Sequence, residues 1–152
     1  MTLRTQISDS LKQAMKDKDA NRLSTLRLIN AAIKDKDIAA RSTGQDEGVS
    51  EDEVLAILGK MSKQRLESAR AYEEGGRLDL ADREREEISV IEEFLPRQLD
   101  EAESARAVDE AVAEVGATSI RDMGKVMGIL KSRYTGQMDF GTVGPMVKNR
   151  LS

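Results

Sequence analysis

The chain has 152 residues and a formal net charge of −4, and it contains no cysteine, histidine or tryptophan. This composition excludes a thiol nucleophile, a histidine base, a disulfide framework and a zinc site built from Cys and His. Because only two Tyr and two Phe are present, aliphatic and Met side chains must fill the core, and stacking on single-stranded nucleic acid is not expected.

Apolar residues recur every three or four positions along almost the whole chain, which predicts an all-α fold. The first two helices are expected at about residues 3–16 and 20–40, followed by a loop over residues 41–49. Ser50 with Glu53 has the spacing of a capping box, so a third helix should begin there.

The third helix is expected to end at Gly75 and Gly76, where the two glycines would supply left-handed backbone geometry. A fourth helix follows at about residues 79–94. Its outer face is acidic, and we interpret that face as a solvated surface and not as a metal site. The acidic residues are Glu84, Glu86, Glu87, Glu92 and Glu93.

A domain boundary is predicted between Leu95 and Pro96, because proline disfavours helical geometry in the residue before it. Asp100 with Glu103 then forms a new capping box. The chain therefore divides into two expected domains. Residues 1–95 would form about four helices in long hairpins, and residues 96–152 would form a small domain of three helices.

The second domain is expected to contain three helices. The first spans residues 101–115 and ends at Gly116, the second begins at a cap at Ser119, and the third spans about residues 142–150. In the last helix Pro145 is expected in the first turn, where its missing amide hydrogen costs little.

Charge is distributed unevenly. Residues 1–95 hold 16 Lys and Arg against 20 Asp and Glu, a balance of −4, whereas residues 96–152 hold 8 of each. From Gly116 onward, six cations stand against two anions, a local balance of +4. Any nucleic acid bound by this chain should therefore bind near its C-terminal end.

The helix after Ser119 has two contrasting faces. Met123, Val126, Met127 and Leu130 form a core stripe, and the opposite face combines cations with small residues. These are Arg121, Gly124, Lys125, Gly128 and Ser132. Two interpretations remain: phosphate groups approach the glycines between the cations, or a neighbouring helix packs on the glycines and the cations are simply solvated.

Motifs for common chemistries are missing from the sequence. Neither Gly59-Lys60 nor Gly124-Lys125 completes a P-loop, and there is no G-x-S-x-G elbow and no Glu-x-x-His pair for a di-iron bundle. We therefore predict no catalytic residue, no cofactor and no metal site. No apolar run is long enough to span a membrane and no secretory or transit segment is evident, so a cytoplasmic location is expected.

Several segments together resemble the YqeY-like family. They are RLSTLRL at residues 22–28, QRLESARAYEEGGRLDLA at 64–81, FLPRQL at 94–99 and RDMGKVMG at 121–128. That family is similar to the tail of the B subunit of the glutamine-dependent amidotransferase that converts Glu-tRNA(Gln) or Asp-tRNA(Asn) to the amide form. The resemblance implies a helical N-terminal domain and a three-helix C-terminal domain. Pro145 departs from the expected pattern.

In the amidotransferase the corresponding tail is associated with recognition of the tRNA body, not with bond making. The resemblance thus implies a non-catalytic accessory protein that binds tRNA, or a tRNA-amidotransferase-like complex, through its C-terminal domain. The cations expected to contact phosphates, and the glycines expected to permit their approach, are Arg121, Lys125, Lys131, Arg133 and Lys148, with Gly124 and Gly128.

Two alternatives remain at this stage. The first is a helical protein–protein interaction module that presents the acidic face of residues 84–93 to another protein. The second is a carbon–nitrogen ligase with glutamine as amido-N-donor, which the family relationship nominally suggests. The sequence contains neither an amidase centre nor an ATP-using domain, so the second alternative lacks the machinery it requires.

Overall fold

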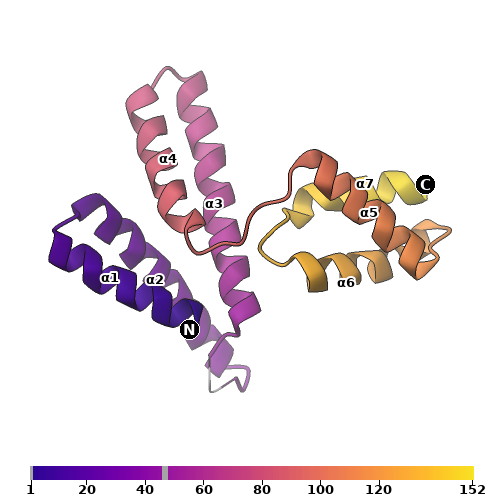
Figure 1. Cartoon of the computed structure of the whole chain (residues 1–152), viewed down its shortest axis with the longest axis horizontal. Coiled ribbons are helices and arrows are strands. Elements are labelled where there is room, and N and C mark those ends of the chain that lie inside the picture. The colour runs from indigo at the N-terminus through magenta and orange to yellow at the C-terminus, as the bar shows by residue number, and fades with distance from the viewer. Residues whose placement is uncertain (1, 46–47) are drawn as a thin grey trace. The chain divides into compact units, whose positions relative to one another are not determined.

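The computed structural model describes residues 2–45 and 48–152, and in these ranges it contains seven α-helices, one short 3₁₀ turn and no strand (Figure 1). The all-α prediction is confirmed. The elements are α1 (Leu3–Asp17), α2 (Ala20–Arg41), α3 (Glu51–Glu74), α4 (Leu78–Glu92), α5 (Glu101–Val115), η1 (Ile120–Asp122), α6 (Met123–Tyr134) and α7 (Phe140–Leu151).

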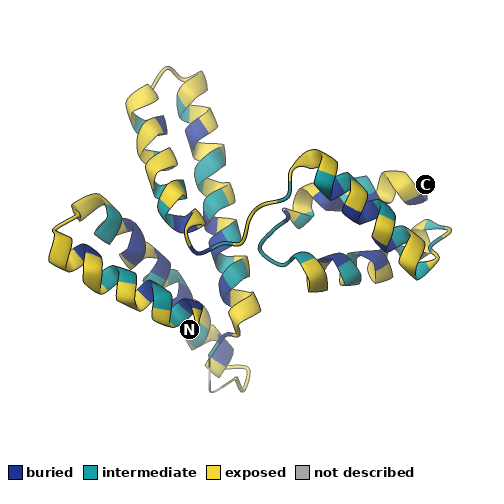
Figure 2. Ribbon diagram, viewed as in Figure 1, coloured by how far each residue is buried: buried dark blue, intermediate teal, exposed yellow. Residues whose placement is uncertain are grey.

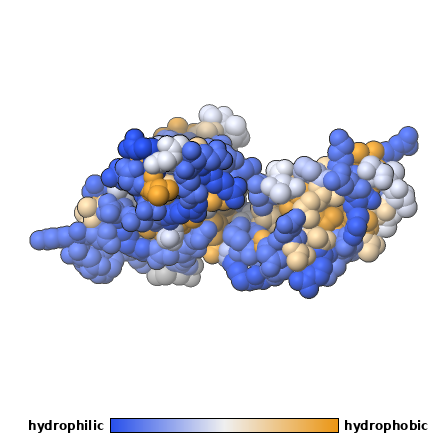
Figure 3. All heavy atoms as spheres, turned by 90° about the horizontal axis from the view of Figure 1, so that it is seen from above, coloured by the Kyte–Doolittle hydropathy of each residue, from blue (hydrophilic) through white to orange (hydrophobic). Residues whose placement is uncertain are grey.

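The chain divides into two compact units, Met1–Leu95 and Pro96–Ser152, which we call the N-terminal and C-terminal units. Each has its own cluster of buried aliphatic side chains, drawn in dark blue in Figure 2. In Figure 3 the visible surface is mostly hydrophilic, with smaller hydrophobic areas between. Whether each unit folds by itself stays a prediction.

The N-terminal unit consists of two helical hairpins, α1 with α2 and α3 with α4, and α4 also packs against α2. Its core is aliphatic, as the scarcity of aromatic residues requires, and the largest fully buried side chains include Leu26, Ile29, Leu58 and Ile91. The helix α3 begins with the predicted capping box, in which Ser50 and Glu53 satisfy each other's backbone amides.

A polar clasp joins α1, α2 and the segment before α3. The Asp37 carboxylate accepts hydrogen bonds from Nη1 and Nη2 of Arg4 at 2.9 and 2.6 Å, and from the Val49 amide at 2.9 Å. Gly48 precedes this contact with a φ of +86°, and a Cβ there would lie 2.5 Å from Asp37 Oδ1. The loop predicted over residues 41–49 thus closes onto α2, although residues 46 and 47 lie outside the described ranges.

Replacing Asp37 with Asn should lower the free energy of unfolding by about 1–2 kcal/mol at pH 7. The Arg4 hydrogen bonds, and then the Val49 amide, lower the pKa of Asp37 from 3.8 to about 2. A carboxyl whose pKa is lower in the folded state stabilises the fold at pH values above 3.8, and this stabilisation disappears as the pH falls through about 2.

Urea unfolding of the parent and Asp37→Asn proteins across this pH range measures the effect. The stability difference between them should be largest at neutral pH and shrink towards pH 2. A difference that is independent of pH would show that the ionised carboxylate does not stabilise the clasp.

The C-terminal unit is a bundle of α5, α6 and α7, with the side chains of Val126, Leu130 and Val147 fully buried between the helices. Its first helix has the predicted capping box of Asp100 and Glu103. It ends, as expected, at Gly116, whose φ of +69° is the left-handed geometry that glycine adopts at little cost.

The sixth helix begins later than predicted. Ser119 makes no side-chain cap bond, and residues 120–122 form the 3₁₀ turn η1 before α6 starts at Met123. The Asp122 carboxylate does not reach back to Ser119 but accepts a hydrogen bond from the Thr118 amide at 3.1 Å, which draws the chain into the tighter turn.

The last helix begins earlier than predicted, and Pro145 is not in its first turn. Asp139 caps α7 by accepting hydrogen bonds from the Gly141 amide and the Thr142 hydroxyl, both at 3.0 Å, so the helix starts at Phe140. Pro145 is therefore the sixth residue of α7. The preceding Gly144 has no Cβ, which relaxes the steric conflict that proline normally imposes on its predecessor.

Two smaller differences concern α3 and α4. Gly75 has a φ of −82°, so only Gly76, at +76°, takes the left-handed geometry expected of both glycines. The helix α4 spans Leu78–Glu92 and not residues 79–94, because the chain turns at Glu93 and buries Phe94 in the core.

Candidate nucleic-acid interface

Five of the predicted site residues lie on one exposed face formed by η1 and α6. They are Arg121, Gly124, Lys125, Gly128 and Lys131, which we call the basic glycine face. Because an α-helix turns by about 100° per residue, these five positions lie within about 120° of one another around the helix axis. The opposite side of α6 carries the fully buried Val126 and Leu130, which hold the helix in the bundle.

The two glycines of this face have open space in front of them. Apart from the adjoining residues and backbone of its own helix, a Cβ placed on Gly124 or on Gly128 would meet no atom within 4 Å, and the same holds for Gly144 in α7. Glycine within a helix costs about 1 kcal/mol relative to alanine. Within the C-terminal unit no neighbouring helix packs on these glycines, so tight packing inside this bundle does not account for them.

The cations beside the glycines are not neutralised. Within the described residues, Arg121, Lys125, Lys131 and Lys148 have no ion-pair partner. The first three lie on the basic glycine face, and Lys148 is exposed on α7, which packs against α6. A cation that has no ion-pair partner within the fold can bind a phosphate oxygen without breaking an internal contact.

Arg133 differs from the other predicted cations. Its Nη2 donates to Glu114 Oε1 of α5 at 2.5 Å, and this contact raises the pKa of Arg133 and lowers the pKa of Glu114. Arg150 is likewise paired with Asp109 of α5. Arg133 therefore lies apart from the basic glycine face, on the side of α6 that is turned to α5.

The C-terminal unit is polarised even though its formal charge is zero. Residues 96–115, which include α5, carry two cations and six anions, a balance of −4, whereas residues 116–152 carry six cations and two anions. Nucleic acid would be repelled from the exposed side of α5 and attracted to η1, α6 and α7. The polarity of the unit thus points to the same surface as the open glycines.

Sequence analysis did not single out Gly144, a further glycine of the C-terminal unit with open space in front of it. It lies inside α7, whereas Gly136 has the positive φ of a turn residue, 81°. The sequence signal that could have identified Gly144 is its position directly before Pro145. Both residue types disfavour a helix, and neither is needed for a turn at this place.

The described residues contain no group of three or more acidic side chains placed to hold a metal ion. Among the same residues, no helix is long and apolar enough to cross a membrane. The acidic face of α4 is partly neutralised from within the fold, because Glu87 pairs with Arg65 and Glu93 with Arg22.

Replacing Gly124 and Gly128 together with Ala should raise the stability of the C-terminal unit by about 1–2 kcal/mol, because alanine favours a helix and both sites are open. Larger side chains, as in Gly124→Gln with Gly128→Gln, should keep α6 folded but hold a ligand away from its backbone. Thermal unfolding of both variants checks the first expectation. A loss of stability on alanine substitution would mean that the glycines serve the fold.

Comparison with known proteins gives a consistent result. The model of the family described as Yqey-like protein matches residues 4–151. "Altered inheritance of mitochondria protein 41, mitochondrial" from Meyerozyma guilliermondii is 38% identical over 111 residues, which cover 72% of this chain and 53% of that protein. The protein of the same name from Vanderwaltozyma polyspora is 35% identical over 89 residues, 59% of this chain and 46% of its own length.

The chain therefore spans about half the length of the curated relatives it matches. The names of these relatives place them in mitochondria, so they lend no support to the expected cytoplasmic location, which stays a prediction.

Proposed function

This chain belongs to the YqeY-like family, and from that premise we propose that it is a non-catalytic accessory protein that binds tRNA through the basic glycine face. Arg121, Lys125 and Lys131 contact phosphates there, and Lys148 extends the surface onto α7. Gly124 and Gly128 allow the sugar–phosphate backbone to approach the helix.

The observation that carries this proposal is the open space in front of the glycines. Glycines in a helix weaken it, and here no neighbouring element of the C-terminal unit uses the room that they leave. The unpaired cations around them favour an anionic partner with a regular surface. The sugar–phosphate backbone of a folded RNA has both properties.

Arg133 has a secondary role in this proposal. Because it is held by Glu114, it would have to release that carboxylate before it contacted a phosphate. We therefore expect it to contribute less to RNA binding than Lys125 or Lys131, although all three are cationic residues of α6.

The protein partner in this proposal is a tRNA-amidotransferase-like complex, or another enzyme that acts on the bound tRNA. A role as a glutamine-dependent carbon–nitrogen ligase is not proposed, because the sequence has neither an amidase motif nor an ATP-binding motif. The proposal requires a compartment that contains tRNA. Both the cytoplasm and mitochondria contain tRNA, and the names of the relatives place those proteins in mitochondria.

Copurification gives a simple first test. The chain has no Trp and two Tyr, so its own absorbance at 280 nm is weak and bound RNA would dominate the spectrum. We expect protein purified at low salt to carry RNA and protein washed at high salt to lose it. A protein that is free of nucleic acid at low salt, and that also fails to bind added tRNA, would overturn the proposal.

A further inference from the structure

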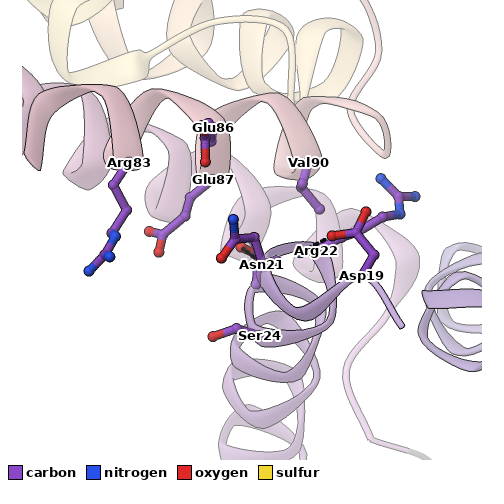
Figure 4. A pocket seen from close by; sticks show the side chains of 9 residues that line it. Asp19, Asn21, Arg22, Ser24, Arg83, Glu86, Glu87 and Val90 are labelled. Atoms are coloured by element: carbon purple, nitrogen blue, oxygen red, sulfur yellow. Dashed lines mark hydrogen bonds between the residues drawn. The ribbon is translucent and has the colours of Figure 1, made fainter. Parts of the chain in front are cut away.

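A second surface of the molecule, in the N-terminal unit, has the features of a site for a small polar ligand. A cleft of about 610 Å³ lies between the start of α2 and the middle of α4 (Figure 4). Its volume is within the range of small-molecule sites, but Val90 is the only apolar residue among the described residues that line it. A ligand of this cleft must therefore be polar.

Two ion pairs fix the walls of the cleft. Arg22 of α2 pairs with Glu93 after the end of α4, and Arg65 of α3 donates from Nε to Glu87 Oε2 of α4 at 2.9 Å. The buried Thr25 hydroxyl is also committed, because it donates to the Asn21 carbonyl at 3.2 Å. These groups build the cleft and have no need of a ligand.

Arg83 is left without a partner by this arrangement. It stands four residues before Glu87 on α4, a spacing that favours an ion pair along the helix. Glu87 is instead held by Arg65, and Arg83 makes no ion pair with any described residue. Figure 4 shows the Arg83 side chain extending from α4 into the open space beside α2, on the same side as Glu87.

Three more polar side chains of the cleft have no partner among the described residues: the Asn21 amide, the Ser24 hydroxyl and the Glu86 carboxylate. Asn21 and Ser24 project from α2 towards the side of the cleft that Arg83 and Glu87 occupy (Figure 4). One wall thus offers neutral hydrogen-bonding groups, and the other offers a guanidinium next to two carboxylates.

From this arrangement we propose that the cleft binds a free amino acid as its zwitterion. The ligand carboxylate pairs with the Arg83 guanidinium, which can bind it in a bidentate manner. The ligand ammonium lies towards the unpaired Glu86 carboxylate, while Asn21 and Ser24 bond the remaining polar atoms. A multiply charged anion such as phosphate is disfavoured, because the two glutamates stand beside the only unpaired arginine of the cleft's described lining.

Nuclear magnetic resonance of the ¹⁵N-labelled full chain tests this proposal. Titration with L-alanine to about 20 mM should shift the amide signals of residues 21–25 and 83–90 in a saturable way. Propionate, which lacks the ammonium, and alaninamide, which lacks the carboxylate, should each bind at least roughly tenfold more weakly. Sodium chloride at the same concentration as L-alanine should not reproduce the shifts.

The matched variants are Arg83→Gln and Arg70→Gln, since Arg70 is an exposed arginine of α3 that has no described partner and does not line the cleft. Arg83→Gln should weaken L-alanine binding at least roughly tenfold without changing the thermal midpoint, and Arg70→Gln should leave binding unchanged. No saturable shift, equal binding by propionate or phosphate, or unchanged binding by Arg83→Gln would each overturn the proposal.

Discussion

Reversing the charge of Lys125 and Lys131 together is expected to weaken tRNA binding by roughly 100-fold at moderate salt. Both lysines are exposed, neither has an ion-pair partner in the described chain, and both flank the open glycines of α6. Each substitution removes a favourable phosphate contact and adds a repulsive carboxylate, so the two effects reinforce each other. Filter binding with bulk tRNA measures the change.

The matched control reverses Arg70 and Arg106, which changes the net charge by the same amount. Both are exposed and without a described partner, one on α3 and the other on the acidic helix α5. This variant should bind tRNA within about threefold of the parent protein, because only the long-range field changes. Equal losses in the two variants would mean that net charge governs binding, and not a surface on α6.

Replacing Leu58 with Ala should lower the stability of the N-terminal unit by about 2–5 kcal/mol. The Leu58 side chain is fully buried in the core that α3 shares with α2 and α4, and its truncation leaves a cavity there. Hydrogen exchange read peptide by peptide should show faster exchange over α1 to α4 and unchanged exchange over α5 to α7.

The reciprocal variant is Leu130→Ala, which removes a fully buried side chain from the C-terminal unit. It should raise exchange over α5 to α7 alone. Together the two variants test whether residues 1–95 and 96–152 are independent folding units. If either substitution loosened both units to the same degree, the chain would behave as one cooperative domain.

Much of the fold follows from local patterns in the sequence. Apolar spacing at helical intervals predicts the helices, and the capping boxes at Ser50 and Asp100 locate two of their starts, because each box is closed by residues only three positions apart. Such signals depend on a few neighbouring residues and need no knowledge of tertiary contacts. The acidic balance of residues 1–95 and the basic balance of residues 116–152 are visible in the same way.

The errors arise where the capping group is ambiguous or the contact is distant. Asp139 is the N-cap of α7, but no nearby residue in the sequence distinguishes a helix start at Asp139 from the preceding turn. Pro145 was therefore predicted in the first turn of the helix, which it is not. The Asp122 carboxylate accepts a hydrogen bond from the Thr118 amide and not from Ser119, and a 3₁₀ turn stands where the helix start was expected. The clasp of Arg4 with Asp37 joins residues 33 positions apart, beyond the reach of any local pattern.

The candidate interface was predicted in part. The rotation of residues around α6 places Gly124, Lys125 and Gly128 on one face from the sequence alone. Whether another helix covers the glycines depends on tertiary packing, and only the structure shows that the space is open. The pairing of Arg133 with Glu114 is likewise a tertiary fact, since the two residues belong to different helices.

The dependence of tRNA affinity on salt concentration tests the central claim most directly. If Arg121, Lys125, Lys131 and Lys148 each contact one phosphate, the logarithm of the association constant should fall against the logarithm of the salt concentration with a slope of about −2.8 to −3.6. Neutralising Lys125 should reduce the magnitude of that slope by about 0.7 to 0.9. No binding at low salt, or an affinity that does not weaken as salt rises, would contradict the account.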